Sequence, residues 1–142
     1  MPDFDLTDRR TFRHWTQVTI RYSDQDAMAH VNNTALATYV ESSRTAFIYE
    51  LINRGGMDGV EFILARLSID YLRELHYPGS VDVGARLIRV GNKSIGTGYG
   101  VFKGDTCVAT AECVNVFYDM ATRKTRVPPE SVRAALMAEM AA

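Results

Sequence analysis

The sequence has no long apolar run, no strong excess of charge of either sign and only two cysteines. No apolar stretch approaches the roughly 20 residues that a membrane-spanning helix needs, so we expect no membrane partner. The formal net charge of −1 disfavours a general nucleic-acid-binding protein, which normally carries a large basic excess. The polar N-terminal residues lack the apolar core of a secretory signal, so a cytoplasmic protein is expected.

The two cysteines, Cys107 and Cys113, are predicted to be free thiols. They lie six positions apart in a strand-like run. This spacing places both on one face of the strand but about 20 Å apart, which is beyond the reach of a disulfide. We therefore expect two small, buried side chains.

The length and composition are those of one globular domain. A chain of 142 residues, 46% of them hydrophobic, is long enough to bury a core. No internal repeat, low-complexity tract or linker divides it. We expect residues 1–15 to form a loosely held N-terminal arm and residues 16–142 to form a single domain.

The first half of the chain is predicted to form one strand and one long helix. Residues 16–22 alternate between polar and apolar side chains, as is typical of a half-buried strand. This strand would bury Val18, Ile20 and Tyr22. Residues 33–54 carry apolar side chains every three or four positions, and Gly55 is a natural helix terminator. This helix would bury Leu36, Val40, Phe47 and Leu51.

From residue 63 onward the pattern becomes that of antiparallel strands. The predicted strands cover residues 63–71, 81–91, 94–103 and 106–118. In the first of them, Ile63, Leu67 and Tyr71 share one side. Short glycine-containing turns separate the last three, as in β-hairpins, and residues 128–142 are predicted to form a short helix. A lone amphipathic helix and a five-stranded sheet must cover each other, which gives a two-layer α+β domain.

The motif GTGYG is not interpreted as a nucleotide-binding loop, because a strand runs straight through it. Gly96, Gly98 and Gly100 alternate and therefore lie on one face of that strand. We expect another backbone or helix to pack closely against this glycine strip.

The stretch SDQDAMAHVNN, residues 23–33, carries the densest group of polar side chains and permits two interpretations. In the first it is an ordinary turn before a helix. Asp24 and Asp26 would then hold the turn through backbone amides, and Asn32 or Asn33 would cap the helix.

In the second interpretation the stretch is a hydrolytic site. The first turn of a helix presents unpaired N–H groups, here at Asn33 and Thr34, that can stabilise a carbonyl oxygen as it gains negative charge. Asp26 would activate water or attack the carbonyl itself, with His30 beside it. No Gly-x-Ser-x-Gly elbow competes for this role. A calcium loop is not favoured, because the turn glycine is absent and Ala35 stands where the closing glutamate belongs; no metal site is expected.

The segment RYSDQDAMAHVNNTALATYVESSR resembles the signature of hotdog-fold acyl-CoA thioesterases of the 4-hydroxybenzoyl-CoA thioesterase type. That signature commonly reads Asp-x-Asp-x-x-Gly-His-Val-Asn-Asn and precedes a helix with a Glu-x-x-Arg pair, and the likeness spans roughly residues 16–130. The resemblance implies a hotdog fold, in which a five-stranded antiparallel sheet wraps around one long central helix. It also implies hydrolysis of a coenzyme A thioester without a cofactor, by a homodimer or homotetramer with active sites between subunits.

The resemblance further assigns roles to individual residues. Asp26 matches the catalytic carboxylate, and Asn33 matches the residue whose backbone amide polarises the thioester carbonyl. His30 matches a histidine used by related acyl-carrier-protein thioesterases.

The sequence departs from the family pattern at three positions. Met28 replaces the asparagine of the acyl-carrier-protein enzymes, Ala29 replaces the usual glycine, and Leu36 replaces a tyrosine. Met28 and Leu36 would line the acyl tunnel. The departures at Ala29 and Leu36 keep open a non-catalytic acyl-thioester-binding protein, and a hotdog hydratase is a third, weaker alternative.

Other charged residues and histidines are predicted to support the structure or to bind the substrate. Glu41 and Arg44 are expected to form a helix-surface ion pair, with Glu41 as the alternative catalytic acid. Arg89 and Lys93 flank a turn and are the candidates for binding the coenzyme A phosphates. Two histidines without a neighbouring polar pattern are assigned structural roles: His14 and His76.

Overall fold

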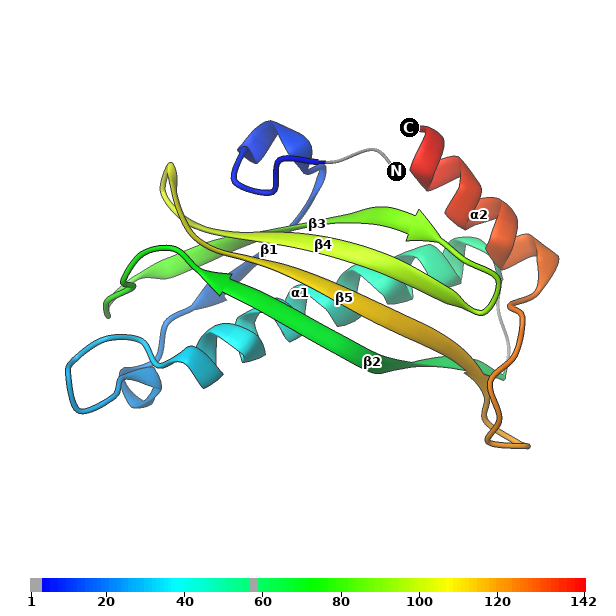
Figure 1. Ribbon diagram of the computed structural model, residues 1–142, viewed down its shortest axis with the longest axis horizontal. Coiled ribbons are helices and arrows are strands. Elements are labelled where there is room, and N and C mark those ends of the chain that lie inside the picture. The colour runs from blue at the N-terminus through cyan, green and yellow to red at the C-terminus, as the bar shows by residue number, and fades with distance from the viewer. Residues whose placement is uncertain (1–3, 57–58) are drawn as a thin grey trace.

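A computed structural model describes residues 4–56 and 59–142 (Figure 1). The helices and strands are β1 (His14–Thr19), α1 (Asn33–Arg54), β2 (Val60–Tyr71), β3 (Ser80–Val90), β4 (Ser94–Lys103), β5 (Thr106–Asp119) and α2 (Glu130–Ala141), with single-turn 3₁₀ helices η1 (Arg9–Thr11) and η2 (Tyr22–Asp24). The strands form one antiparallel sheet in the order β1-β3-β4-β5-β2, and the long helix α1 lies against one face of it. This is the predicted α+β hotdog architecture. Within the described residues, no helix is long and apolar enough to cross a membrane.

Helix α1 forms because its apolar positions recur on one side of the helix and meet the inner face of the sheet. The four residues predicted to be buried on this helix are all buried: Leu36, Val40, Phe47 and Leu51. They join one core cluster with inward-facing residues of β3 and β4, such as Val83 and Tyr99. Burying a side chain of this size contributes about 1.5–3 kcal/mol, so the helix is held mainly by the sheet.

Arg44 also points from α1 into the interior; the expected ion pair with Glu41 is present, but its basic member is buried rather than on the helix surface. The side chain is 5% exposed, and its Nε donates a hydrogen bond to the Asn115 side-chain oxygen at 2.7 Å. Asn115 in turn donates to the hydroxyl of Thr97. Glu41 is exposed and lies 3.8 Å from the guanidinium. Arg44 therefore links α1 to β4 and β5. Its hydrogen bond to Asn115 provides the partner that a buried charged group requires.

Strand β2 is an edge strand with a register shift between Leu64 and Arg66. The shift changes which side chains face α1, because alternation is interrupted by one residue. Ile63 accordingly pairs with Val116 whereas Leu67 pairs with Cys113, an odd separation along β5 that places them on opposite faces of the sheet. The prediction that Ile63 shares a side with Leu67 and Tyr71 is therefore wrong.

Strand β1 is shorter at its C-terminal end than predicted. It stops at Thr19, and the chain then turns into η2. Tyr22 lies in that turn and is exposed rather than buried.

The N-terminal residues from Phe4 to Arg13 lie on the face of the sheet opposite α1 (Figure 1). The glycine strip lies beneath them: a Cβ on Gly98 would contact the Leu6 side chain at 3.0 Å, and one on Gly100 would lie 2.5 Å from the Leu6 carbonyl oxygen. Phe12 is buried beside them. The close backbone approach predicted from the glycines is confirmed, and this part of the predicted arm is packed rather than loosely held.

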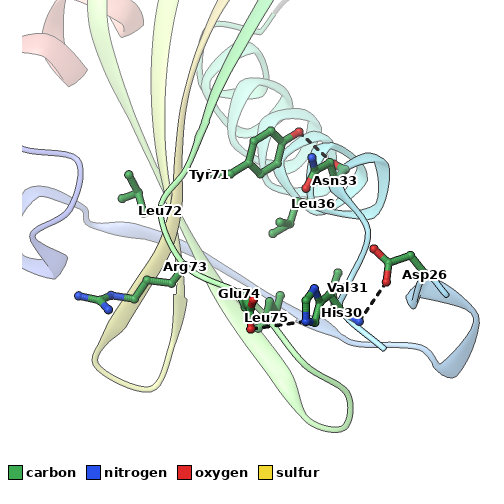
Figure 2. A pocket seen from close by; sticks show the side chains of 10 residues that line it. All are labelled: Asp26, His30, Val31, Asn33, Leu36, Tyr71, Leu72, Arg73, Glu74 and Leu75. Carbon is green, nitrogen blue, oxygen red and sulfur yellow. Dashed lines mark hydrogen bonds and ion pairs between the residues drawn. The ribbon is translucent and has the colours of Figure 1, made fainter. Parts of the chain in front are cut away.

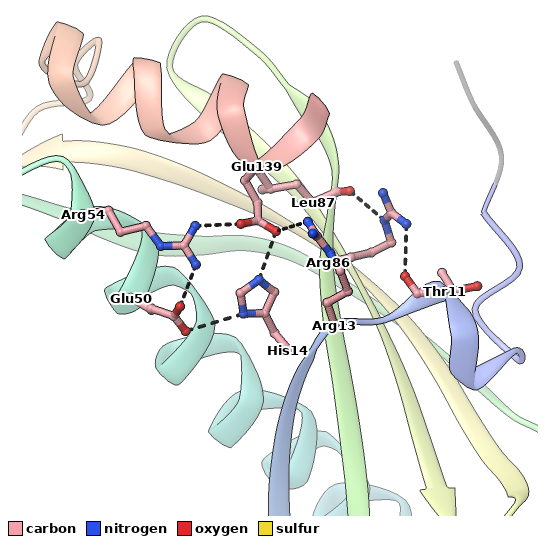
Figure 3. A network of polar contacts seen from close by, with 8 residues as sticks. All are labelled: Thr11, Arg13, His14, Glu50, Arg54, Arg86, Leu87 and Glu139. Atoms are coloured by element: carbon pink, nitrogen blue, oxygen red, sulfur yellow. Dashed lines mark hydrogen bonds and ion pairs between the residues drawn. The ribbon is translucent and has the colours of Figure 1, made fainter. Parts of the chain in front are cut away.

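Helix α2 is anchored by the carboxylate of Glu139 (Figure 3). It accepts a hydrogen bond from Arg54 Nη1 at 2.7 Å and lies 3.0 Å from His14 Nε2. Burial alone would raise the pKa of this carboxyl, but the hydrogen bonds from Arg54 and His14 outweigh it and hold the pKa below its ordinary value. His14 therefore has the structural role predicted for it.

Both cysteines are free thiols, as predicted. Cys113 is buried, and Cys107 is partly exposed. Burial raises the pKa of the Cys113 thiol to about 11, so it is a poor nucleophile.

Candidate active site

A cleft of about 350 Å³ lies between the start of α1 and the chain that leaves β2 (Figure 2). Its walls are Asp26, His30, Val31, Asn33, Leu36, Tyr71, Leu72, Arg73, Glu74 and Leu75. Four of the predicted site residues come together here: Asp26, His30, Asn33 and Leu36. The two sides of the cleft are joined by the Val31 amide, which donates to the Leu75 carbonyl at 2.7 Å.

Asp24 forms the buried support of the loop before α1. Its carboxylate accepts hydrogen bonds from the Arg21 amide at 2.9 Å and from the Tyr39 hydroxyl at 2.5 Å. Burial raises the pKa of Asp24, but the hydrogen bonds from Tyr39 and Arg21 outweigh it and leave the pKa below its ordinary value. Asp24 is thus structural, as predicted, and fixes the position of the residues that follow.

Asp26 holds a turn with one carboxylate oxygen and leaves the other available. Oδ1 accepts hydrogen bonds from the backbone amides of Met28 at 2.9 Å and His30 at 3.1 Å. Among the described residues, no donor contacts Oδ2, and Figure 2 shows this oxygen turned toward the start of α1. The carboxylate is therefore compatible with both interpretations: Oδ1 holds the turn, and Oδ2 remains available for the hydrolytic role.

The start of α1 offers one amide donor rather than the two predicted. Asn32 is the N-cap, and its Oδ1 accepts hydrogen bonds from Thr34 N at 2.7 Å and Ala35 N at 3.4 Å. The Thr34 amide is thereby occupied. The Asn33 amide has no acceptor in the described part of the chain and lies in the first turn, at the positive end of the helix dipole.

The His30 imidazole faces away from the Asp26 carboxylate. Its Nε2 lies 3.5 Å from Glu74 Oε2, and its ring makes an edge-to-face contact with His76 at a centroid distance of 5.0 Å. His30 contacts Asp26 through its backbone alone: its amide donates to the Asp26 carboxylate, and its carbonyl accepts from the Asp26 amide at 2.8 Å. His76 was expected to have no polar neighbours, but it lies beside His30 and Glu74. The segment after β2 brings it next to the loop that precedes α1.

Ala29 occupies the position where related sequences usually have glycine, and it adopts the conformation that glycine favours. Its φ is +59°, in the left-handed region. The turn is therefore kept without glycine, at a backbone cost of about 1–2 kcal/mol.

Three predicted substrate-binding residues lie outside the cleft. Met28 is 73% exposed. Arg89 lies near the C-terminal end of β3 and Lys93 in the turn after it, whereas the cleft residue Leu75 lies five residues before the other end of β3, at Ser80. Ten residues of strand separate these ends by about 30 Å, so neither basic residue can reach the cleft of its own chain.

Six residues of the cleft were not anticipated, and two of them, Arg73 and Tyr71, add polar groups. Arg73 supplies a basic side chain at its edge, and Figure 2 shows the guanidinium pointing outward from it. The Tyr71 hydroxyl donates to the Asn33 carbonyl at 3.2 Å and so links β2 to the start of α1. The sequence did carry a signal for both residues. Tyr71 is the last residue of a predicted strand and Arg73 follows it, and the end of a strand is a position that can face the start of a helix.

The model of the thioesterase-like superfamily matches residues 20–136, while a search of curated proteins gives no match. Among solved structures, the PA5185 protein of Pseudomonas aeruginosa is 28% identical, with 92% of this chain and 94% of that chain covered and a TM-score of 0.77. A thioesterase from Thermus thermophilus, complexed with coenzyme A and Zn, is 25% identical, with 92% and 96% covered and a TM-score of 0.79.

A further similar structure, the DHNA-CoA thioesterase of Staphylococcus aureus, is 19% identical, with 89% of this chain and 90% of that chain covered and a TM-score of 0.78; it supports the fold alone. The family model covers most of the chain and includes every residue of the cleft. The chain therefore belongs to the thioesterase-like superfamily.

Proposed function

We propose that this protein hydrolyses an acyl-coenzyme A thioester to a free acid and a thiol. The observation that carries the proposal is the placement of two groups in one cleft: the available oxygen of Asp26 and the unpartnered amide of Asn33. The Thermus thermophilus thioesterase that is similar to this chain is complexed with coenzyme A. This likeness supports coenzyme A as the carrier of the acyl group.

The chemistry needs an acceptor for negative charge and a group that starts the attack. The Asn33 amide would donate to the thioester oxygen as the tetrahedral intermediate forms; removing one such donor typically costs about 10²–10³ in rate. Asp26 would take a proton from water as the water attacks, or would attack the carbonyl itself to give an anhydride that water then opens. In both routes the C–S bond breaks and the thiolate leaves.

The two backbone hydrogen bonds to Asp26 Oδ1 serve this role, because they fix the carboxylate while its second oxygen stays available. His30 contributes to that fixation through its amide. A direct role of its imidazole in proton transfer stays a prediction, which His30→Ala tests, since that variant keeps the amide and removes the ring.

The cleft walls indicate how the substrate would lie. Val31, Leu36 and Leu75 give an apolar side next to Asn33 for the start of the acyl group. Arg73 replaces Arg89 and Lys93 as the same-chain candidate for the coenzyme A phosphates, since its guanidinium lies at the edge of the cleft.

We further propose that the chain forms a homodimer through β2. This edge strand pairs only with β5 and carries exposed apolar side chains at Ile63, Leu64 and Leu67. An exposed apolar edge strand is a template for pairing with another strand. Through such an assembly Arg89, Lys93 or Met28 could contact a substrate held by another subunit.

The experiment that tests the function is thiol release by the purified protein across a panel of acyl- and aryl-coenzyme A esters. We expect saturable turnover of at least one class of ester. Saturable binding of every ester without thiol release above background would favour the non-catalytic alternative. A hydrated product from an enoyl ester would favour a hydratase.

A further inference from the structure

His30, Glu74 and His76 form a cluster that the hydrolytic proposal does not explain. His30 comes from the loop before α1, whereas Glu74 and His76 come from the segment between β2 and β3. One ligand atom of each residue lies within 4.8 Å of the others, and the cluster is the only such group of three in residues 4–56 and 59–142. All three side chains are at least partly exposed, so an ion could reach them from solvent.

The separations within the cluster approach those of a tetrahedral metal site. Bonds of about 2.05 Å from Zn²⁺ to nitrogen or oxygen place neighbouring ligand atoms about 3.3 Å apart. Glu74 Oε2 lies 3.5 Å from His30 Nε2 and 3.4 Å from His76 Nε2. The ligand nitrogens of the two imidazoles lie within 4.8 Å of each other, and rotation of the partly exposed His30 side chain would bring them closer.

The second nitrogen of His76 is already engaged in the way that metal-binding histidines require. Its Nδ1 lies 3.2 Å from the Ala29 carbonyl oxygen. A carbonyl can only accept, so Nδ1 donates to it and Nε2 is the nitrogen left to face Glu74, where it would offer its lone pair to a metal ion. A backbone hydrogen bond of this kind fixes the tautomer and orientation of a metal-binding imidazole.

We propose that His30, Glu74 and His76 bind one divalent transition-metal ion of the zinc class at the mouth of the cleft, with the fourth position open to water. Two imidazoles and one carboxylate suit borderline ions such as Zn²⁺, whereas Mg²⁺ and Ca²⁺ prefer all-oxygen sites. The ion would join the loop before α1 to the segment after β2. This joins the two walls of the cleft, so metal binding stabilises the folded protein.

The test is titration of the chelator-treated, tag-free protein with Zn²⁺ by calorimetry. We expect one ion per chain, a higher melting temperature with Zn²⁺ and no competition from excess Mg²⁺ or Ca²⁺. Co²⁺ should give the intense visible absorption of a tetrahedral site. These readouts do not depend on thioester hydrolysis, so failure of the metal site and failure of the proposed activity are distinguishable.

Variants connect the binding to these side chains. Glu74→Gln and His76→Gln should each weaken Zn²⁺ binding by about 10-fold or more, while Glu112→Gln, an exposed carboxylate on β5, should leave it unchanged. Because Glu74 and His76 are exposed, both variants are expected to fold, and circular dichroism checks this. Absence of stoichiometric Zn²⁺ binding, or equal affinity in the wild type and both variants, would overturn the proposal.

Discussion

The side-chain oxygen of Asn32 accepts a hydrogen bond from the amide of Thr34 at 2.7 Å. This cap occupies the second amide of α1 and leaves the first, at Asn33, for a ligand. Asn32→Ala should lower the free energy of unfolding by about 1 kcal/mol and also lower kcat, because the first turn that holds the Asn33 amide loosens. Urea unfolding and thiol release measure the two effects. Ser42→Ala, which removes an exposed hydroxyl from the same helix, is the control; equal stability of both variants would show that Asn32 does not cap α1.

The positive φ of Ala29 predicts that glycine is better tolerated there than any other residue. Ala29→Gly removes left-handed strain of about 1–2 kcal/mol and adds about 0.4–1 kcal/mol of unfolded-state entropy. We therefore expect the melting temperature to stay equal or rise. Ala29→Val should lower it, because a β-branched side chain opposes this conformation. A clear loss of stability in Ala29→Gly would contradict the assigned backbone.

The contact between Glu139 and its partners predicts acid-sensitive anchoring of α2. Because the pKa of the folded-state carboxyl lies below its ordinary value of 4.5, its contribution is present above about pH 4.5 and is lost as the pH falls through the folded pKa. Wild type should exceed Glu139→Gln in stability at pH 7, and the difference should shrink below pH 4.5. Chemical unfolding at several pH values measures it. A difference independent of pH would show that the charge of Glu139 contributes nothing.

The edge strand β2 predicts the oligomeric state. Light scattering after size-exclusion chromatography should give the mass of a dimer or of a larger multiple for the wild type. Leu64→Lys places a charge on the exposed edge and should shift the population toward monomer. Gln17→Lys, on the short edge strand β1, is the matched control. A monomeric wild type would remove the proposed interface.

The sequence was sufficient where local pattern decides the structure. The spacing of Leu36, Val40, Phe47 and Leu51 predicted the buried side of α1, and the alternating glycines of β4 predicted a close backbone approach. Both depend only on the periodicity of a helix or a strand. Asp26 and Asn33 were singled out from their places before and within the first helical turn together with the resemblance to the thioesterase signature; the structure places both in one cleft, and their catalytic roles stay predictions.

The sequence could not predict the features that depend on contacts between distant segments or on a single irregularity in a strand. Arg44 is buried because Asn115, 71 positions away, accepts its hydrogen bond. The register shift after Leu64 places Ile63 on the face of the sheet opposite Leu67 and Tyr71, and no glycine or proline marks the shift in the sequence. His76 joined His30 only because the segment between β2 and β3 passes beside the loop, which no spacing rule anticipates.

Two carboxylates have been considered for catalysis, Asp26 in the cleft and Glu41 on α1, and comparing their variants tests the central claim. Asparagine at position 26 can still accept the amide hydrogen bonds of the turn, so Asp26→Asn removes the charge with little change in the loop. With the best coenzyme A ester, we expect Asp26→Asn to lower kcat by about 10²–10⁴ and Glu41→Gln to stay within a few-fold of wild type. Turnover by Asp26→Asn at the wild-type rate, or a large loss confined to Glu41→Gln, would contradict the assignment of Asp26.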